Sequence, residues 1–163
     1  SVPDLVPSIG QPTPSLVVNQ TSQLPIVVTN VGNLASAGTT SVIFTVPTNF
    51  SGPTTAFSDN GWSCSATVGV TVTCTKSASI APLGTDTVNI PIKPLPAAGG
   101  TTANFTVNIT NSGDSNTTNN SATTALQVAV APQTQTLWLK ADAGTNCTTN
   151  GCSLSSWNDQ SGL

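Results

Sequence analysis

The feature that most constrains the fold is an alternation of apolar and polar positions with a period of two, which recurs along the chain. In residues 24–30, for example, Leu24, Ile26 and Val28 would share one face. Successive side chains of a strand point to opposite sides, so this period is typical of strands with one buried face. The same pattern predicts six further inward-facing sets: Val42, Phe44 and Val46; Trp62, Cys64 and Ala66; Val70, Val72 and Cys74; Val88, Ile90 and Ile92; Phe105, Val107 and Ile109; and Leu126, Val128 and Val130.

Turn-forming residues separate these segments, at positions 30–33, 58–61, 82–84, 97–100 and 111–116. A weaker N-terminal strand is interrupted by prolines, and a proline inside a strand indicates the edge of a sheet. Seven or eight short strands with no helical pattern between them predict an all-β fold, an immunoglobulin-like antiparallel β-sandwich with a C-terminal extension. We place the sandwich at residues 1–130 and a linker with its extension at residues 131–163.

The composition supports a folded all-β chain and excludes several functions. Only 6% of the residues are charged, all of them Asp or Lys, and Val, Ile and Thr are abundant. Disordered chains are usually rich in charge and poor in β-branched residues. The lysines are scattered, so we expect no nucleic-acid partner, and no apolar run is long enough for a membrane span. Because the chain contains no Met, we expect that a signal peptide was removed or that the chain is a fragment.

The four cysteines occur in two close pairs, Cys64 with Cys74 and Cys147 with Cys152. Such spacing in a chain rich in Thr, Ser and Asn predicts two local disulfides and an oxidising compartment, so we expect a secreted or cell-surface protein. Cys64 and Cys74 share the inward face of consecutive strands, where a bond would connect a hairpin beneath Trp62. The alternatives are a zinc site of four thiolates and a redox-active pair, but the Cys-x-x-Cys spacing of either is missing.

Asparagine provides candidate modification sites, since seven N-x-Ser/Thr sequons occur in the chain. Asn104 and Asn108 would point outward, opposite the apolar face of their strand. The alternative is that Asn and Thr form the polar face of a protein with little charge. The sequons lie at Asn19, Asn49, Asn104, Asn108, Asn116, Asn119 and Asn146.

Residues 113–120 are rich in Asp and Asn oxygens, which could hold calcium. The alternative is a turn held by side-chain hydrogen bonds, because only Asp114 supplies a carboxylate there. We therefore expect no metal and no cofactor. The chain has no His to serve as a base for Ser115, so we expect no enzyme and no catalytic residue. An isopeptide crosslink through Lys76 or Lys93 is a further alternative.

Residues 2–130 resemble a known bacterial module. The motifs are TNVGN at 29–33, GWSC at 61–64 with TC at 73–74, and an Asp- and Asn-rich loop before the last strand. They resemble the bacterial surface repeat called domain-of-unknown-function eleven, which is similar to the cell-adhesion-related repeats. The resemblance implies an immunoglobulin-like domain, often in tandem, in long secreted or cell-wall proteins that serve as stalks, adhesins or filaments. It implies no catalytic residues.

Residues 137–163 resemble the first strands of a concanavalin-A-like (laminin-G-like) lectin domain, through LWLKADAG and WNDQSG. An isolated apolar strand cannot bury its own face. We therefore expect this extension to continue into a further domain or to pack on a neighbouring subunit. The expected assembly contacts are Leu137, Trp138, Leu139 and Trp157.

The sequence thus favours a structural extracellular module of a surface stalk, adhesin or fibre, which polymerises through its tail or an edge strand. Its expected partners are copies of itself or adjacent domains of the same chain, with glycans as a second class. The alternative function is that of a carbohydrate-binding, lectin-like surface protein truncated after residue 163.

Overall fold

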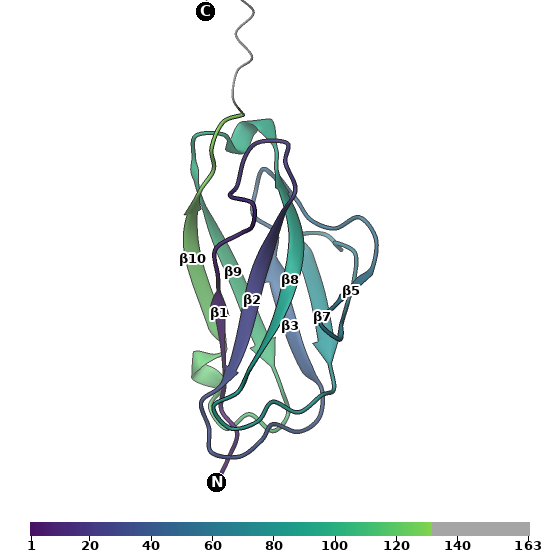
Figure 1. Ribbon diagram of the computed structural model, residues 1–163, viewed down its shortest axis with the longest axis vertical. Helices are drawn as coiled ribbons and strands as arrows, with labels where there is room; N and C mark the ends of the chain where they lie inside the picture. The colour runs from purple at the N-terminus through teal and green to yellow at the C-terminus, as the bar shows by residue number, and fades with distance from the viewer. Residues whose placement is uncertain (132–163) are drawn as a thin grey trace, which may run out of the picture. The chain divides into compact units, whose positions relative to one another are not determined.

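Ten strands and two short 3-10 helices make up residues 1–131, the part of the chain that the computed structural model describes (Figure 1). They form two antiparallel sheets that pack face to face as an immunoglobulin-like β-sandwich. The first sheet contains, in spatial order, β1 (Leu5–Ile9), β2 (Ser22–Asn30), β8 (Thr85–Pro94) and β4 (Phe50–Ser51).

The second sheet has six strands and carries the hairpin described below. Two of its strands are only three residues long, and one of these, Phe57–Asp59, was not predicted from the sequence. The two-residue strand β4 of the first sheet was not predicted either. Its spatial order is β10 (Ser121–Gln127), β9 (Thr102–Thr110), β3 (Thr40–Thr45), β7 (Thr71–Lys76), β6 (Trp62–Cys64) and β5 (Phe57–Asp59). The 3-10 helices are η1 (Pro96–Ala98), between β8 and β9, and η2 (Thr117–Asn119), between β9 and β10.

The core lies between the two sheets and contains most of the side chains that the alternation placed on the inner faces. It also contains six residues that the alternation did not identify: Leu5, Leu16, Val18, Phe50, Ile80 and Ala98. Three of the residues predicted to face inward are not buried. Ala66 is only half-buried, and Val70 and Val130 are 60% and 61% exposed. The physical reason is that β7 begins at Thr71 and β10 ends at Gln127, so Val70 and Val130 lie beyond the strand ends.

Aromatic contacts join the sheets at the centre of the core. Phe105 of β9 stacks against Phe44 of β3, with ring centroids 6.3 Å apart. Phe50 of β4, in the opposite sheet, meets the same ring edge-on at 5.2 Å. Phe105 is fully buried, so both contacts are shielded from water.

The prolines of β1 and β2 leave the ladder between β2 and β8 intact. Pro7 lies in β1, at the edge of its sheet, as the sequence indicated. Pro25 lies in the internal strand β2, and its carbonyl accepts a hydrogen bond from Gly10 N–H. Because the N–H and C=O of a strand residue point to the same side, Pro25 lacks its donor on the β1 side, and the β2–β8 ladder stays complete.

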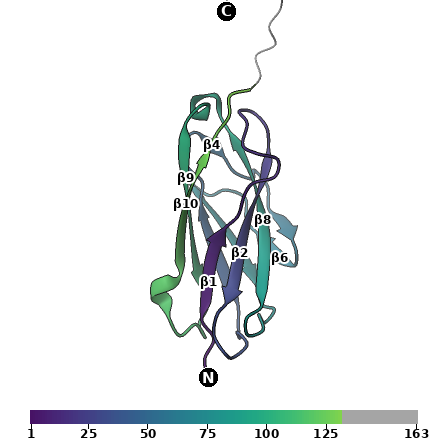
Figure 2. The ribbon, with the colours of Figure 1, turned by 60° about the vertical axis from the view of Figure 1, so that its left-hand side comes forward.

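The described chain begins and ends at opposite ends of the sandwich (Figures 1 and 2). Val17, in the segment that follows β1, forms a parallel bridge with Ala129, just after β10. Val18 N–H donates to the Ala129 carbonyl (3.1 Å), and Ala129 N–H donates to the Leu16 carbonyl (2.9 Å). Within residues 1–131, no helix has the length and apolar character required to cross a membrane.

Candidate functional site

The β5–β6 hairpin turns at Asn60 and Gly61, within the turn predicted for residues 58–61. Both residues have positive φ, 47° and 80°. A two-residue hairpin turn of this kind matches the right-handed twist of its strands, and Asn-Gly is its preferred sequence because both residues tolerate the left-handed region. The turn brings Asp59 and Trp62 opposite each other.

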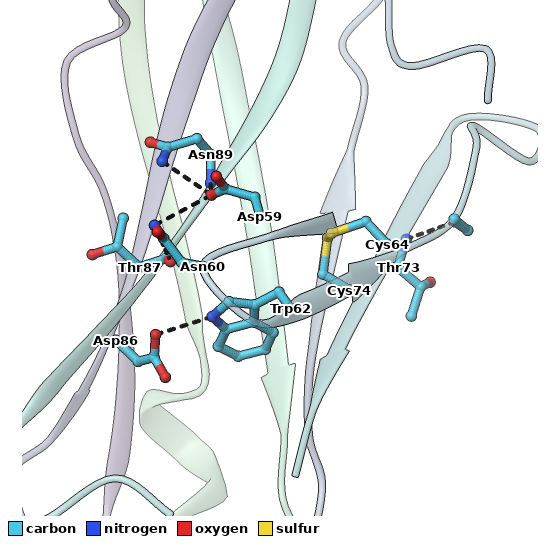
Figure 3. Close-up of a disulfide and its surroundings, with 10 residues drawn as sticks. Asp59, Asn60, Trp62, Cys64, Thr73, Cys74, Asp86, Thr87 and Asn89 are labelled. Atoms are coloured by element: carbon cyan, nitrogen blue, oxygen red, sulfur yellow. Dashed lines mark hydrogen bonds between the residues drawn. A yellow bond between two sulfur atoms is a disulfide. The ribbon is translucent and has the colours of Figure 1, made fainter. Parts of the chain in front are cut away.

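A disulfide connects the next pair of strands. Cys64 of β6 and Cys74 of β7 lie directly opposite each other, with their Cα atoms 4.0 Å apart, and their sulfur atoms are bonded (Figure 3). Both residues face the core, as the sequence predicted. The bond therefore fixes two neighbouring strands of one sheet and does not cross between the sheets.

Trp62 links the hairpin to the opposite sheet. Its side chain is 1% exposed, and its Nε1–H donates to Asp86 Oδ1 of β8 at 3.1 Å. Lys76 Nζ lies 2.7 Å from Asp86 Oδ2 and 5.9 Å from the centroid of the Trp62 ring. The same amine donates to the Asn60 carbonyl at 2.7 Å. One carboxylate thus accepts from an indole and a lysine on two different strands.

The hairpin also covers a free edge of the first sheet. Strand β4 pairs with β8 only at Lys93 and Pro94, which leaves the rest of that edge without a strand. There Asp59 Oδ2 accepts from Asn89 N–H (2.7 Å) and from Asn89 Nδ2 (3.0 Å). Asn60 Nδ2 donates to the Thr87 carbonyl at 3.2 Å, so side chains of one sheet satisfy backbone groups of the other (Figure 3).

We call this set the hairpin clamp: Asp59, Asn60, Trp62, Lys76 and Asp86. Sequence reasoning identified the turn, the disulfide and the buried Trp62, but not the partners Asp86 and Asn89. The signal for a turn, Asp-Asn-Gly, does not show which strand the turn reaches. The clamp holds the two sheets together through hydrogen bonds and one ion pair. Both of its carboxylates are already bonded to donors of the protein itself.

The structure separates the predicted sequons into two groups. Asn19, Asn49, Asn104 and Asn108 are exposed, and the last two lie on the outer face of β9 as predicted. Asn116 and Asn119 are half-buried, and Asn119 Nδ2, the atom that a glycan would occupy, donates to Asp4 Oδ1 at 2.8 Å. Outside the described residues lie Asn146, Cys147, Cys152 and the expected assembly contacts Leu137, Trp138, Leu139 and Trp157.

The loop at residues 113–120 contains the side-chain bonds expected of a turn. Asp114 Oδ1 accepts from Asn116 N–H at 3.2 Å, and Asn116 Oδ1 accepts from Thr118 N–H at 3.3 Å. Ser115 Oγ donates to the Pro3 carbonyl at 2.7 Å. These bonds tie the loop to itself and to the N-terminal segment.

Strand β10 forms the other notable surface, because it is the last strand of its sheet. An open groove runs between β10 and residues 11–16, lined by Gln11, Pro12, Leu16, Ala125 and Gln127 among others. In the described part of the chain, no strand pairs with Ser121–Gln127 on the side away from β9. This edge resembles those to which a further strand can be added.

No family model matches the chain, and no curated protein matches it. Among solved structures, it is similar to the CARDB domain of the PF1109 protein from Pyrococcus furiosus, crystallised in complex with di-metal ions. The two are 17% identical, the match covers 80% of this chain and 96% of that one, and the TM-score is 0.51. A solution structure of the same domain matches with 17% identity, 79% and 97% coverage and a TM-score of 0.48. The first similarity shows the fold: an immunoglobulin-like sandwich of the kind found in CARDB domains.

Proposed function

We propose that residues 1–131 are a structural extracellular module of a surface stalk, adhesin or fibre, which carries tension between its two ends. The observation that carries this proposal is the parallel bridge between Val17 and Ala129, in a unit whose chain begins and ends at opposite ends. Pulling on the ends would slide these two segments past each other, so their hydrogen bonds would resist together in shear.

The disulfide supports an extracellular location, because such bonds persist in oxidising compartments. The resemblance of residues 2–130 to the surface repeat called domain-of-unknown-function eleven, and the CARDB-like fold, support an adhesion-related role. We propose a secreted or cell-surface protein with no catalytic role.

We propose that assembly uses the open edge of β10. Its groove would accept an added strand, which is an established mode of protein association. The proposed partners are further copies of this chain or adjacent domains, with residues 137–139 as the first candidate for the assembly contact. The second candidate function, carbohydrate binding, rests only on the resemblance of residues 137–163 to a lectin domain. Comparing chain 1–163 with chain 1–131 on a glycan array would test it.

Single-molecule force spectroscopy on tandem copies of the full chain tests the tensile role. Ala129→Pro removes the N–H that donates to Leu16, and we expect it to lower the unfolding force. Val130→Pro is the matched control, because no backbone hydrogen bond from its N–H is found in the described residues. Equal unfolding forces for the two variants and the unchanged chain would contradict the proposal.

A further inference from the structure

A polar cluster lies where the start of β1 meets the β9–β10 loop. Figures 1 and 2 show η2 beside the first residues of β1, and the two elements are in contact. Leu5 N–H donates to Asp114 Oδ1 at 3.3 Å, and Ser115 N–H donates to the Pro3 carbonyl at 3.1 Å. Asn119 Nδ2 donates to Asp4 Oδ1 at 2.8 Å, so two carboxylates lie in this cluster.

Three oxygen atoms of this cluster are buried without a hydrogen-bond donor: Asp114 Oδ2, Asn119 Oδ1 and Asn120 Oδ1. In the described residues only one other buried side-chain atom, Ser22 Oγ, is in this state. Buried polar atoms are nearly always bonded, so three such acceptors in one loop require an explanation. The turn bonds do not provide one, because they use other atoms.

Asn120 is the strongest indicator, because its side chain is only 9% exposed. It directly precedes β10, in which Ser121 is exposed and Ala122 packs against the core. Its backbone is not extended (φ −79°, ψ 10°), and its carbonyl accepts from the N–H of the buried Ile109 of β9 at 2.9 Å. β1 is in contact with both η2 and β10, the elements on either side of Asn120, so this buried oxygen belongs to the segment that meets the start of β1.

The cluster also lacks a positive partner. The only ion pair among residues 1–131 joins Lys76 to Asp86, in the hairpin clamp, and the other described lysine, Lys93, lies opposite β4. In the same residues no group of three or more His, Cys, Asp or Glu comes together. A ligand set here must therefore combine two carboxylates with amide oxygens.

We propose that this cluster binds a calcium ion through the side-chain oxygens of Asp4, Asp114, Asn119 and Asn120, with water completing the shell. The three buried oxygen atoms that lack a hydrogen-bond donor are all acceptors, and a single cation could bind all three. Calcium takes six to eight oxygen ligands in flexible geometry, whereas magnesium requires a near-ideal octahedron. The site revises our expectation that the chain binds no metal. Bound calcium would fix the start of β1 to the β9–β10 loop.

Isothermal titration calorimetry and thermal unfolding of the chelator-treated full chain test the proposal, with CaCl2 as the probe. We expect a Kd on the order of 0.1–1 mM, as in extracellular modules. Saturating calcium should raise the thermal midpoint by about 5 °C, because the ion binds only the folded state. Sodium chloride at equal ionic strength should give no such rise. If 10 mM calcium produces neither binding heat nor a shift of the thermal midpoint, the calcium site is wrong. Trapped water would then be the explanation for the unpaired oxygen atoms.

Two variants localise the ion. Asp114→Asn should weaken binding at least about tenfold, since it removes one of two charges that attract the ion. Asn120→Asp should strengthen binding and enlarge the midpoint shift, because it adds a charge at an unbonded oxygen. Asp59→Asn, in the hairpin clamp, is the matched control and should leave Kd unchanged. Unchanged calcium affinity in both test variants, or an equal loss of affinity in the control, would contradict the proposed site.

Discussion

At the scale of single residues, Cys64 and Cys74 contribute more than their contacts with the core. They lie opposite each other in adjacent strands, so bonding them requires no rearrangement of the register. The bond closes a loop with a sequence separation of 10 residues. Its main effect in the chain-entropy description is to restrict the unfolded chain.

Replacing both residues, as Cys64→Ala with Cys74→Ala, should lower the free energy of unfolding by about 3 kcal/mol, since the unfolded chain regains the entropy of the open loop. Urea denaturation under non-reducing conditions measures the change. Ser63→Ala, on the exposed face of the same strand, is the control and should stay within about 0.5 kcal/mol of the unchanged chain. A double variant that unfolds at the original midpoint would contradict this account.

At the scale of elements, the β5–β6 hairpin serves as a cover for β8. Free strand edges are sites of unwanted pairing, and proteins protect them with charges, bulges or covering loops. Here side chains protect the edge, because Asp59 and Asn60 form hydrogen bonds with the backbone groups that an added strand would use. The two sheets are thereby joined at an edge as well as through the core.

Asp59→Ala should remove the acceptor of Asn89 N–H. We expect it to lower the free energy of unfolding by about 1–3 kcal/mol, the usual effect of leaving a partly buried donor unpaired. Hydrogen exchange at the Asn89 amide should accelerate, while amides of β2, on the other side of β8, should change little. Asp59→Asn keeps an acceptor oxygen and should show a smaller loss. Unaltered exchange at Asn89 in the alanine variant would show that the carboxylate does not protect this edge.

The longer strands could be predicted from the sequence, but most of their neighbours in space could not. Alternation identifies Val42 and Phe44 as inward-facing because burial requires it locally. It cannot show that Trp62 meets Asp86, since that contact depends on how two sheets pack. For the same reason the cysteine pair and the Asn60-Gly61 turn were predictable, whereas the hydrogen bonds that Asn89 donates to Asp59 were not. The two-residue strand β4 is too short to show any period.

At the scale of the whole described unit, stability depends on burial rather than charge. The core contains residues of all the longer strands, while residues 1–131 contain a single ion pair. Phe105 is central because it contacts Phe44 in its own sheet and Phe50 in the other. Its ring therefore connects the two layers.

Phe105→Ala should lower the free energy of unfolding by about 3–5 kcal/mol, the range for deleting a buried aromatic ring. Thermal and urea denaturation should agree on the loss, as expected if the sandwich unfolds cooperatively. Val70→Ala, at an exposed valine, is the control and should change it by no more than about 0.5 kcal/mol. A loss for Phe105→Ala as small as that of the control would mean that the aromatic cluster is not the centre of the core.

The disulfide also limits how far the unit can lengthen. An extended chain spans about 3.3–3.6 Å per residue, so the 10-residue separation between Cys64 and Cys74 withholds roughly 33–36 Å of contour length while the bond is intact. A module unfolded by tension would therefore extend in two stages, the second available only after reduction. In an oxidising environment this part of the contour length cannot extend. The redox state of the surroundings therefore sets the maximum length of the unfolded module.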